Sequence, residues 1–197
     1  MAGNPNVGSL RSRAGGKVIR DAVPADVKQL LRLVGELALY EDAPEAVEAT
    51  EEGLHRALFG PDPKVFALVA EPSGLVVRPN VRPVVGMAFY FVSFSTWTGR
   101  HGLYVEDLFV EPEYRSQGFG RALLAGVCAR AVQLGCARVE WAVLDWKTPA
   151  LEFYRSLGAV PLDGWTTYRL SGHALTEFGD RVQHRDQGPP SLSLDGP

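Results

Sequence analysis

The sequence is poor in cysteine, with two residues, Cys128 and Cys136, in a chain of 197. Two cysteines cannot form a framework of disulfides in a chain of this length, so the hydrophobic core must supply the stability. Such cysteine usage is typical of a reducing compartment, and we expect a cytoplasmic protein. Cys128 falls in a helical apolar pattern and is predicted to be a small core residue.

Long apolar runs and an excess of positive charge are also lacking. No apolar run approaches about 18 residues, which excludes a spanning helix, and residues 1–17 lack the apolar segment of a secretory signal. The formal net charge is −3, so we expect neither nucleic acid nor a membrane as a partner. With 46% hydrophobic residues, the chain is suited to one compact domain.

Composition changes near both ends of the sequence. Residues 1–16 carry Gly, Ser and Arg with little apolar content, and we predict a disordered N-terminal arm. Residues 180–197 are polar and proline-rich, which favours a flexible C-terminal tail. Residues 17–179 are predicted to form a single domain.

Within this domain, hydrophobic periodicity predicts the order β-α-α-β-β-β-α-β-α-β, an α/β (α+β) fold with a mixed sheet. Thr50, followed by two acids, is a candidate N-cap, and residues 72–83 suit a hairpin loop. The predicted strands are residues 17–22, 64–72, 83–95, 101–110, 137–145 and 165–170, and the predicted helices are 24–41, 50–60, 119–134 and 148–158.

A glycine turn, RSQGFG, joins the strand that ends near Val110 to the helix that follows. It lacks the Lys and Ser/Thr of a P-loop and the first glycine of a dinucleotide fingerprint. Free N–H groups at the start of a helix can hold a phosphate or pyrophosphate, to which Arg115 can add charge. An ordinary strand–helix connection explains the glycines equally well, so both interpretations stay open from this turn alone.

Two adjacent carboxylates, Glu106 and Asp107, interrupt an otherwise apolar strand. If one face of the strand is covered, one of the pair points inward, where desolvation raises its pKa toward the range of a general base. An edge-strand residue or a salt bridge is the structural alternative. Tyr154, on a later predicted helix, can act as a general acid or can pack on the sheet as an aromatic side chain.

These motifs together resemble the GNAT superfamily of N-acetyltransferases. The turn matches the Arg/Gln-x-x-Gly-x-Gly/Ala signature of that superfamily, and FYRSLGA lies about 30 residues later, in the expected order. Over roughly residues 17–178 the chain is similar to the spermidine/spermine acetyltransferase family. The segments STWTGR and AVLDW resemble its thialysine N-epsilon-acetyltransferase branch.

The resemblance implies an enzyme that transfers acetyl from acetyl-CoA, without a metal, to a primary amine of a small basic amino acid, diamine or polyamine. Glu106 would be the base, acting through water, and Tyr154 the acid that protonates the thiolate. The positions implied for acetyl-CoA are Leu108, Phe109, Val110, Arg115, Ser116, Gln117, Gly118, Phe119, Gly120, Arg121, Lys147, Ala150 and Tyr154. Those implied for the acceptor are Tyr40, Glu41, Trp97, Glu106, Asp107, Glu140, Trp141, Ala142 and Asp163.

One position departs from the family pattern, because Lys147 stands where the family usually has Asn seven residues before the catalytic Tyr. The acidic segment of residues 40–52 can attract a dication or can be a solvated face. The family is typically homodimeric, which implies a dimer here. Three alternatives stay open: a protein Lys or N-terminal acetyltransferase, a non-catalytic acyl-CoA-binding module, and an unrelated nucleotide-binding protein.

Overall fold

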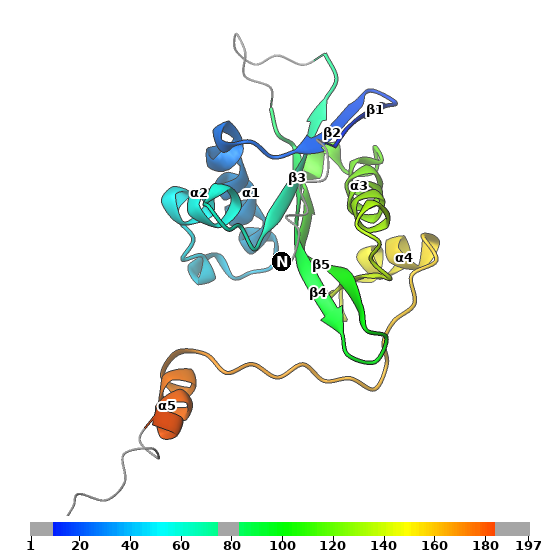
Figure 1. The fold of residues 1–197 in the computed structure, drawn as a ribbon. Coiled ribbons are helices and arrows are strands. Elements are labelled where there is room, and N and C mark those ends of the chain that lie inside the picture. Colours follow the sequence, from blue (N-terminus) through cyan, green and yellow to red (C-terminus); the bar gives the residue numbers. More distant parts are fainter. Residues whose placement is uncertain (1–9, 75–82, 184–197) are drawn as a thin grey trace, which may run out of the picture. The chain divides into compact units, whose positions relative to one another are not determined.

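The computed structural model describes residues 10–74 and 83–183 (Figure 1). Most of the predicted N-terminal arm (residues 1–9), hairpin loop (75–82) and C-terminal tail (184–197) lies outside the described residues. The chain separates into two units, residues 1–144 and 145–197, and each is described by itself.

The first unit contains a six-stranded sheet whose strands lie in sequence order. Every neighbouring pair is antiparallel except β5 and β6, which are parallel. The predicted class, a mixed and mostly antiparallel sheet with flanking helices, is therefore confirmed. The strands are β1 (Arg11–Ala14), β2 (Lys17–Asp21), β3 (Phe66–Pro72), β4 (Gly86–Ser95), β5 (Arg100–Val110) and β6 (Val139–Trp141).

Helices cover both faces of this sheet (Figure 1). α1 (Val27–Tyr40) and α2 (Glu51–Phe59) lie on one face, and α3 (Phe119–Gln133) packs across β2, β3, β4 and β5 on the other. Single turns of 3-10 helix occur at Pro24–Asp26, Pro44–Ala46 and Pro112–Tyr114. Thr50 caps α2 as predicted, because its hydroxyl accepts from the Gly53 amide at 3.1 Å.

Alternation along the strands divides the core between the two helical layers. The cluster on the α1–α2 face includes Leu30 and Leu33 of α1 with Met87 and Phe89 of β4. On the other face, α3 approaches the sheet closely at Gly126, where a Cβ would lie 2.8 Å from Leu68 Cδ1. Only a glycine fits this approach without movement of a neighbour.

The prediction for Cys128 is wrong, because this residue is exposed on α3. The buried stripe of α3 runs through Phe119, Leu123, Val127 and Ala131, and position 128 falls one step outside it. A cysteine next to a buried valine fits the sequence pattern without belonging to the buried stripe.

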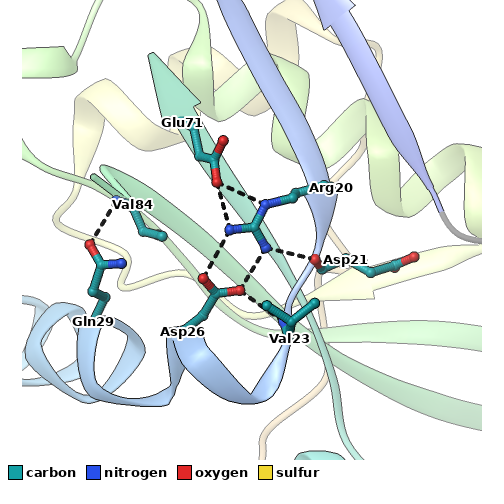
Figure 2. Close-up of polar contacts among 7 residues, drawn as sticks. All are labelled: Arg20, Asp21, Val23, Asp26, Gln29, Glu71 and Val84. Atoms are coloured by element: carbon teal, nitrogen blue, oxygen red, sulfur yellow. Dashed lines mark hydrogen bonds and ion pairs between the residues drawn. The ribbon is translucent and has the colours of Figure 1, made fainter. Parts of the chain in front are cut away.

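A buried ion network ties β2 to the start of α1 (Figure 2). Arg20 donates to both oxygens of Asp26, at 2.6 and 2.9 Å, and its Nε donates to Glu71 Oε1 of β3 at 2.8 Å. The hydrogen bonds that Arg20 donates to Asp26 raise the pKa of Arg20 above its ordinary value. On the opposite face of β2, the buried Arg130 of α3 donates to Asp21 at 2.8 and 2.9 Å. Adjacent residues of one strand thus anchor both helical layers.

β1 forms at residues 11–14, inside the segment predicted as a disordered arm. Its hairpin to β2 turns at Gly15 and Gly16, both with positive φ, 55° and 78°. This Gly-Gly turn is the local sign of a hairpin that the low apolar content of the segment concealed. β6 spans three residues, which is shorter than the strand predicted over residues 137–145.

The second unit contains α4 (Thr148–Ser156) and α5 (Gly172–Gln183). α4 was predicted, whereas α5 was not. α5 crosses the predicted boundary between the domain and the tail. The strand predicted over residues 165–170 is not formed. β-rich side chains alone do not make a strand, because the backbone also needs a hydrogen-bonding neighbour. In the described parts of the chain, no helix is long and apolar enough to cross a membrane.

Candidate active site

An irregularity in the pairing of β4 and β5 determines where the side chains of the two adjacent carboxylates point. Phe89 pairs with Asp107 and the next residue, Tyr90, pairs with Val105, so Glu106 is an extra residue in β5. Such a bulge reverses the alternation of side chains beyond it. Val105 therefore follows Tyr90 toward α3, whereas Asp107 follows Phe89 toward the α1 face.

Asp107 is the half-buried member of the acidic pair, and Glu106 is exposed. Burial, followed by the negative charges of Glu106 and Glu41, raises the pKa of Asp107 to about 6. A carboxylate with such a pKa can exchange a proton near neutral pH. The environment that the sequence predicted for one of the pair is thus found at Asp107.

The backbone of β5 has one open side next to this carboxylate. β6 pairs with Leu103, Tyr104 and Val105 and provides no partner farther along β5. Among the described strands, the segment from Asp107 to Val110 pairs with β4 alone. An open strand edge of this kind can accept hydrogen bonds from, and donate them to, an extended amide-containing ligand.

The glycine turn follows directly after this strand. Ser116 (φ 59°) and Gly118 (φ 82°) both adopt the left-handed conformation, which turns the chain into α3 at Phe119. The Gln117 side chain holds the loop by donating to the Glu113 carbonyl at 2.8 Å. The first amides of α3, which have no partner within the helix, are suited to an anion.

Lys17, at the start of β2, is a cation beside this turn that the sequence did not indicate. Its Nζ lies 5.4 Å from the centroid of the Phe119 ring, within cation–π range, and donates to the Gly15 carbonyl at 2.9 Å. A Cβ at Gly118 would lie 3.4 Å from Lys17 Cε. The β1–β2 hairpin brings Lys17 to this position, which could be inferred only once β1 was known.

Arg115, which the sequence placed at the anion site, has its side chain elsewhere. Its Nε donates to the Val110 carbonyl at 3.0 Å, and its guanidinium carbon lies 4.3 Å from the centroid of the Tyr40 ring. The same carbon lies 5.5 Å from the centroid of Phe109. Arg115 therefore contacts the last residue of α1, and Glu41 follows directly.

The remaining predicted acceptor positions of the first unit fall into two places. Glu140, on β6, is opposite Tyr104 of β5 and accepts from Arg138 Nε at 2.5 Å, with Trp141 next on the strand and Ala142 just after it. Trp97 lies instead in the turn between β4 and β5 and is 88% exposed. The strand length between Arg100 and Glu106 corresponds to roughly 20 Å, so Trp97 is not brought close to the acids within this unit.

The second unit carries the other predicted positions. Lys147 precedes α4 and is buried, and Ala150 and Tyr154 lie one turn apart on the same side of that helix. Burial raises the pKa of Tyr154, so its hydroxyl keeps its proton at neutral pH. Asp163 lies in the irregular segment after α4. Among residues 10–74 and 83–183, no group of His, Cys, Asp and Glu is arranged to hold a metal ion.

The model of the acetyltransferase (GNAT) family matches residues 36–159, which include the end of α1, the acidic pair, the glycine turn and α4. The chain belongs to this family. It is an acetyltransferase, as the sequence predicted.

Several relatives match most of the length of this chain. Thialysine N-epsilon-acetyltransferase of Bos taurus is 40% identical over 167 residues, covering 83% of this chain and 98% of the relative. The same enzyme of Mus musculus is 37% identical over 83% and 97% of the two chains. L-ornithine N5-acetyltransferase of Arabidopsis thaliana is 32% identical over 80% and 85%. These relatives confirm the resemblance to this branch of the superfamily.

Solved structures agree with the fold. An integron cassette protein from the mobile metagenome of V. cholerae has a TM-score of 0.66 and 24% identity, covering 84% of this chain and 99% of the other. An aminoglycoside acetyltransferase from an uncultured soil sample has a TM-score of 0.64 and 20% identity, covering 79% and 97%. At these identities the comparison concerns the fold alone.

Proposed function

We propose that this GNAT enzyme transfers the acetyl group of acetyl-CoA to a primary amine of a small basic amino acid, diamine or polyamine. The relatives named for thialysine and ornithine support this acceptor class. The observation that carries the proposal is Asp107, a half-buried carboxylate with a pKa of about 6, beside Glu106, Glu41 and the open edge of β5. A small cation is the ligand that such a group of negative charges favours.

The residues of the first unit fit acetyl-CoA. Leu108 and Phe109 offer backbone groups on the open edge of β5 to the pantetheine amides, whereas the carbonyl of Val110 is already engaged by Arg115. The amides from Ser116 to Arg121 suit the pyrophosphate, and Lys17 adds a positive charge beside them. A side chain at position 118 would crowd this space. When bound, acetyl-CoA supplies an activated acyl group and a thiolate leaving group.

In the proposed reaction, side chains of the protein carry out the proton transfers. An acceptor ammonium with a pKa near 10.4, the ordinary value of lysine, is almost entirely protonated at pH 7, so a base must remove a proton before the nitrogen can attack. Glu106, at the solvent-exposed position, takes this proton through water, and Asp107 behind it holds the ammonium. Tyr154, protonated at neutral pH because its pKa is raised, donates its phenolic proton to the departing sulfur.

The direct test measures steady-state acetylation by acetyl-CoA with thialysine, lysine, ornithine, putrescine, spermidine and a histone peptide. We expect turnover of at least one free amine with a kcat/KM above that for the peptide. Turnover of the peptide alone would assign the chain to protein acetylation. Binding of CoA without turnover of any amine would favour a non-catalytic acyl-CoA-binding module.

We further propose that two copies of the chain associate. Support comes from the segment after α4, where Val160, Leu162, Tyr168 and Leu170 are exposed although their composition favours a strand. A second chain can supply a strand neighbour for residues 166–170, which form no strand in the described part of the chain. It can also bring Trp97 of the β4–β5 turn to an acceptor site from which its own strand separates it.

A further inference from the structure

Arg115 occupies the first position of the glycine-turn signature, where a positive charge suggests a phosphate ligand. Its side chain turns back along the strand instead. The Nε–H donates a hydrogen bond to the Val110 carbonyl, and the guanidinium lies near the rings of Tyr40 and Phe109. Phe109 belongs to the core cluster on the α1 face of the sheet, whereas α3, which offers the amides, covers the opposite face.

α1 is held against the end of β5 and the turn after it by two contacts. Arg32 of α1 pairs with Glu111, the residue that follows β5. Arg115 then contacts Tyr40, the last residue of α1, within the distance at which an aromatic face attracts a cation. Glu41 comes next, and its charge is one of those that raise the pKa of Asp107, so its carboxylate lies near that residue.

We propose that Arg115 is a positioning residue for the acceptor amine: by contacting Tyr40 and the Val110 carbonyl, it holds Tyr40 and Glu41 against β5 next to Asp107. In this role it does not supply charge to the cofactor phosphates, which are served by the turn amides and Lys17. The proposal rests on the proposed function, because it concerns the acceptor side of the same site.

Arginine is suited to this role for a geometric reason. Its planar guanidinium can stack on a ring while its Nε donates along the plane to a carbonyl, which the tetrahedral ammonium of lysine cannot do. A lysine at position 115 would keep the charge but could not make both contacts at once. The substitution Arg115→Lys therefore separates the two possible roles.

The kinetic test compares Arg115→Met, Arg115→Lys, Tyr40→Leu and Tyr40→Phe with the wild type. We expect the first three to raise the KM for the acceptor amine about tenfold, which corresponds to the upper range of one cation–π contact. The KM for acetyl-CoA should change less than about twofold. Tyr40→Phe keeps the ring and should raise the KM for the amine less than Tyr40→Leu does. The double variant Arg115→Met/Tyr40→Leu should be no worse than either single variant, since both remove the same contact.

Lys17→Met is the matched comparison, because it removes a positive charge beside the turn without touching Tyr40. It should raise the KM for acetyl-CoA and leave that for the amine unchanged. The proposal would be overturned if Arg115→Met raised the KM for acetyl-CoA alone and Arg115→Lys restored it.

A second readout is independent of turnover. The carboxyl carbon of Asp107, followed by NMR over a pH series in the free protein, should titrate near the value of about 6 in the wild type. In Arg115→Met it should titrate at lower pH, because Glu41 moves away and water enters. An unchanged titration would refute the positioning role, whereas a lowered one would support it even if no free amine proved to be a substrate.

Discussion

At the scale of single residues, Asp107 binds its proton more tightly in the folded chain than in the unfolded chain. Its folded pKa of about 6 exceeds the ordinary aspartate value of 3.8, because burial and two negative neighbours oppose ionisation. Between these values the folded state binds more protons than the unfolded state, so the free energy of unfolding falls as pH rises through this window. Above about pH 6 the ionised Asp107 destabilises the fold.

Asp107→Asn should therefore stabilise the protein at pH 7, by at most about 3 kcal/mol, and should have little effect at pH 4. Urea denaturation at the two pH values measures the difference. Asp62→Asn, which changes an exposed carboxylate, is the control and should alter stability by less than about 0.5 kcal/mol at either pH. An equal gain for Asp107→Asn at both pH values would contradict this account.

The rate of acetylation should depend on the same carboxylate. In the wild type, kcat/KM for the amine should fall as pH drops through about 6, because the protonated Asp107 no longer holds a cation. Glu106→Gln removes a like charge next to Asp107, so this acid limb should move to lower pH. In Asp107→Asn, kcat/KM should no longer fall as pH drops through about 6. If kcat/KM of Asp107→Asn still fell near pH 6, the fall would have to come from the protonation of another group.

At the scale of elements, two helical glycines differ in their surroundings. A Cβ at Gly35 of α1 would meet no atom within 4 Å, whereas one at Gly126 of α3 would lie 2.8 Å from Leu68 Cδ1. Gly35→Ala should stabilise the protein by about 1 kcal/mol through helix propensity. Gly126→Ala should destabilise it by about 1–2 kcal/mol, since overpacking at the sheet exceeds that gain. Thermal unfolding of both variants tests the pair, and stabilisation by Gly126→Ala would show that Leu68 yields without strain.

The ion network between β2, β3 and α1 gives a second prediction at this scale. Arg20→Met would leave Asp26 and Glu71 buried without their cation, and should destabilise the protein by about 3–5 kcal/mol at pH 7. Arg56→Met breaks an exposed pair with Glu52 on α2 and should change stability by less than about 1 kcal/mol. Equal losses in the two variants, measured by chemical denaturation, would mean that burial of the network has no energetic weight.

Sequence periodicity was sufficient to predict α1, α3 and the central strands, since each combines a regular apolar pattern with a clear stop. It failed for β1, a short polar strand whose pairing depends on the turn at Gly15 and Gly16. In the site, the sequence identified the acidic pair and the glycine turn. It could not tell which acid is half-buried, because that depends on a bulge opposite Phe89 and Tyr90. The direction of the Arg115 side chain likewise depends on Tyr40, 75 positions earlier in the chain.

At the scale of the whole molecule, the proposed association of two chains predicts the mass of the protein in solution. Light scattering coupled to gel filtration should give the mass of two chains of 21.4 kDa each. The double substitution Tyr168→Glu/Leu170→Glu should give a single chain, because it places charges in the exposed apolar segment. Val132→Glu, at an exposed apolar position of α3, should leave the mass unchanged. A wild-type mass equal to that of one chain would contradict the proposed dimer.

The extra residue at Glu106 has a consequence for how this sequence can vary. A substitution there changes chemistry but leaves the phase of β5 intact. A deletion of Glu106 would make Val105 and Asp107 direct neighbours. Neighbours in a regular strand point to opposite faces, so Val105 would still face α3, and Asp107 and Phe109 would still face α1. Glu106 can therefore be lost without turning a buried side chain of β5 to the other face, although its carboxylate would be lost with it. A deletion at a regularly paired position of β5 would instead turn the residues on one side of it to the opposite face, and should be tolerated less well than loss of Glu106.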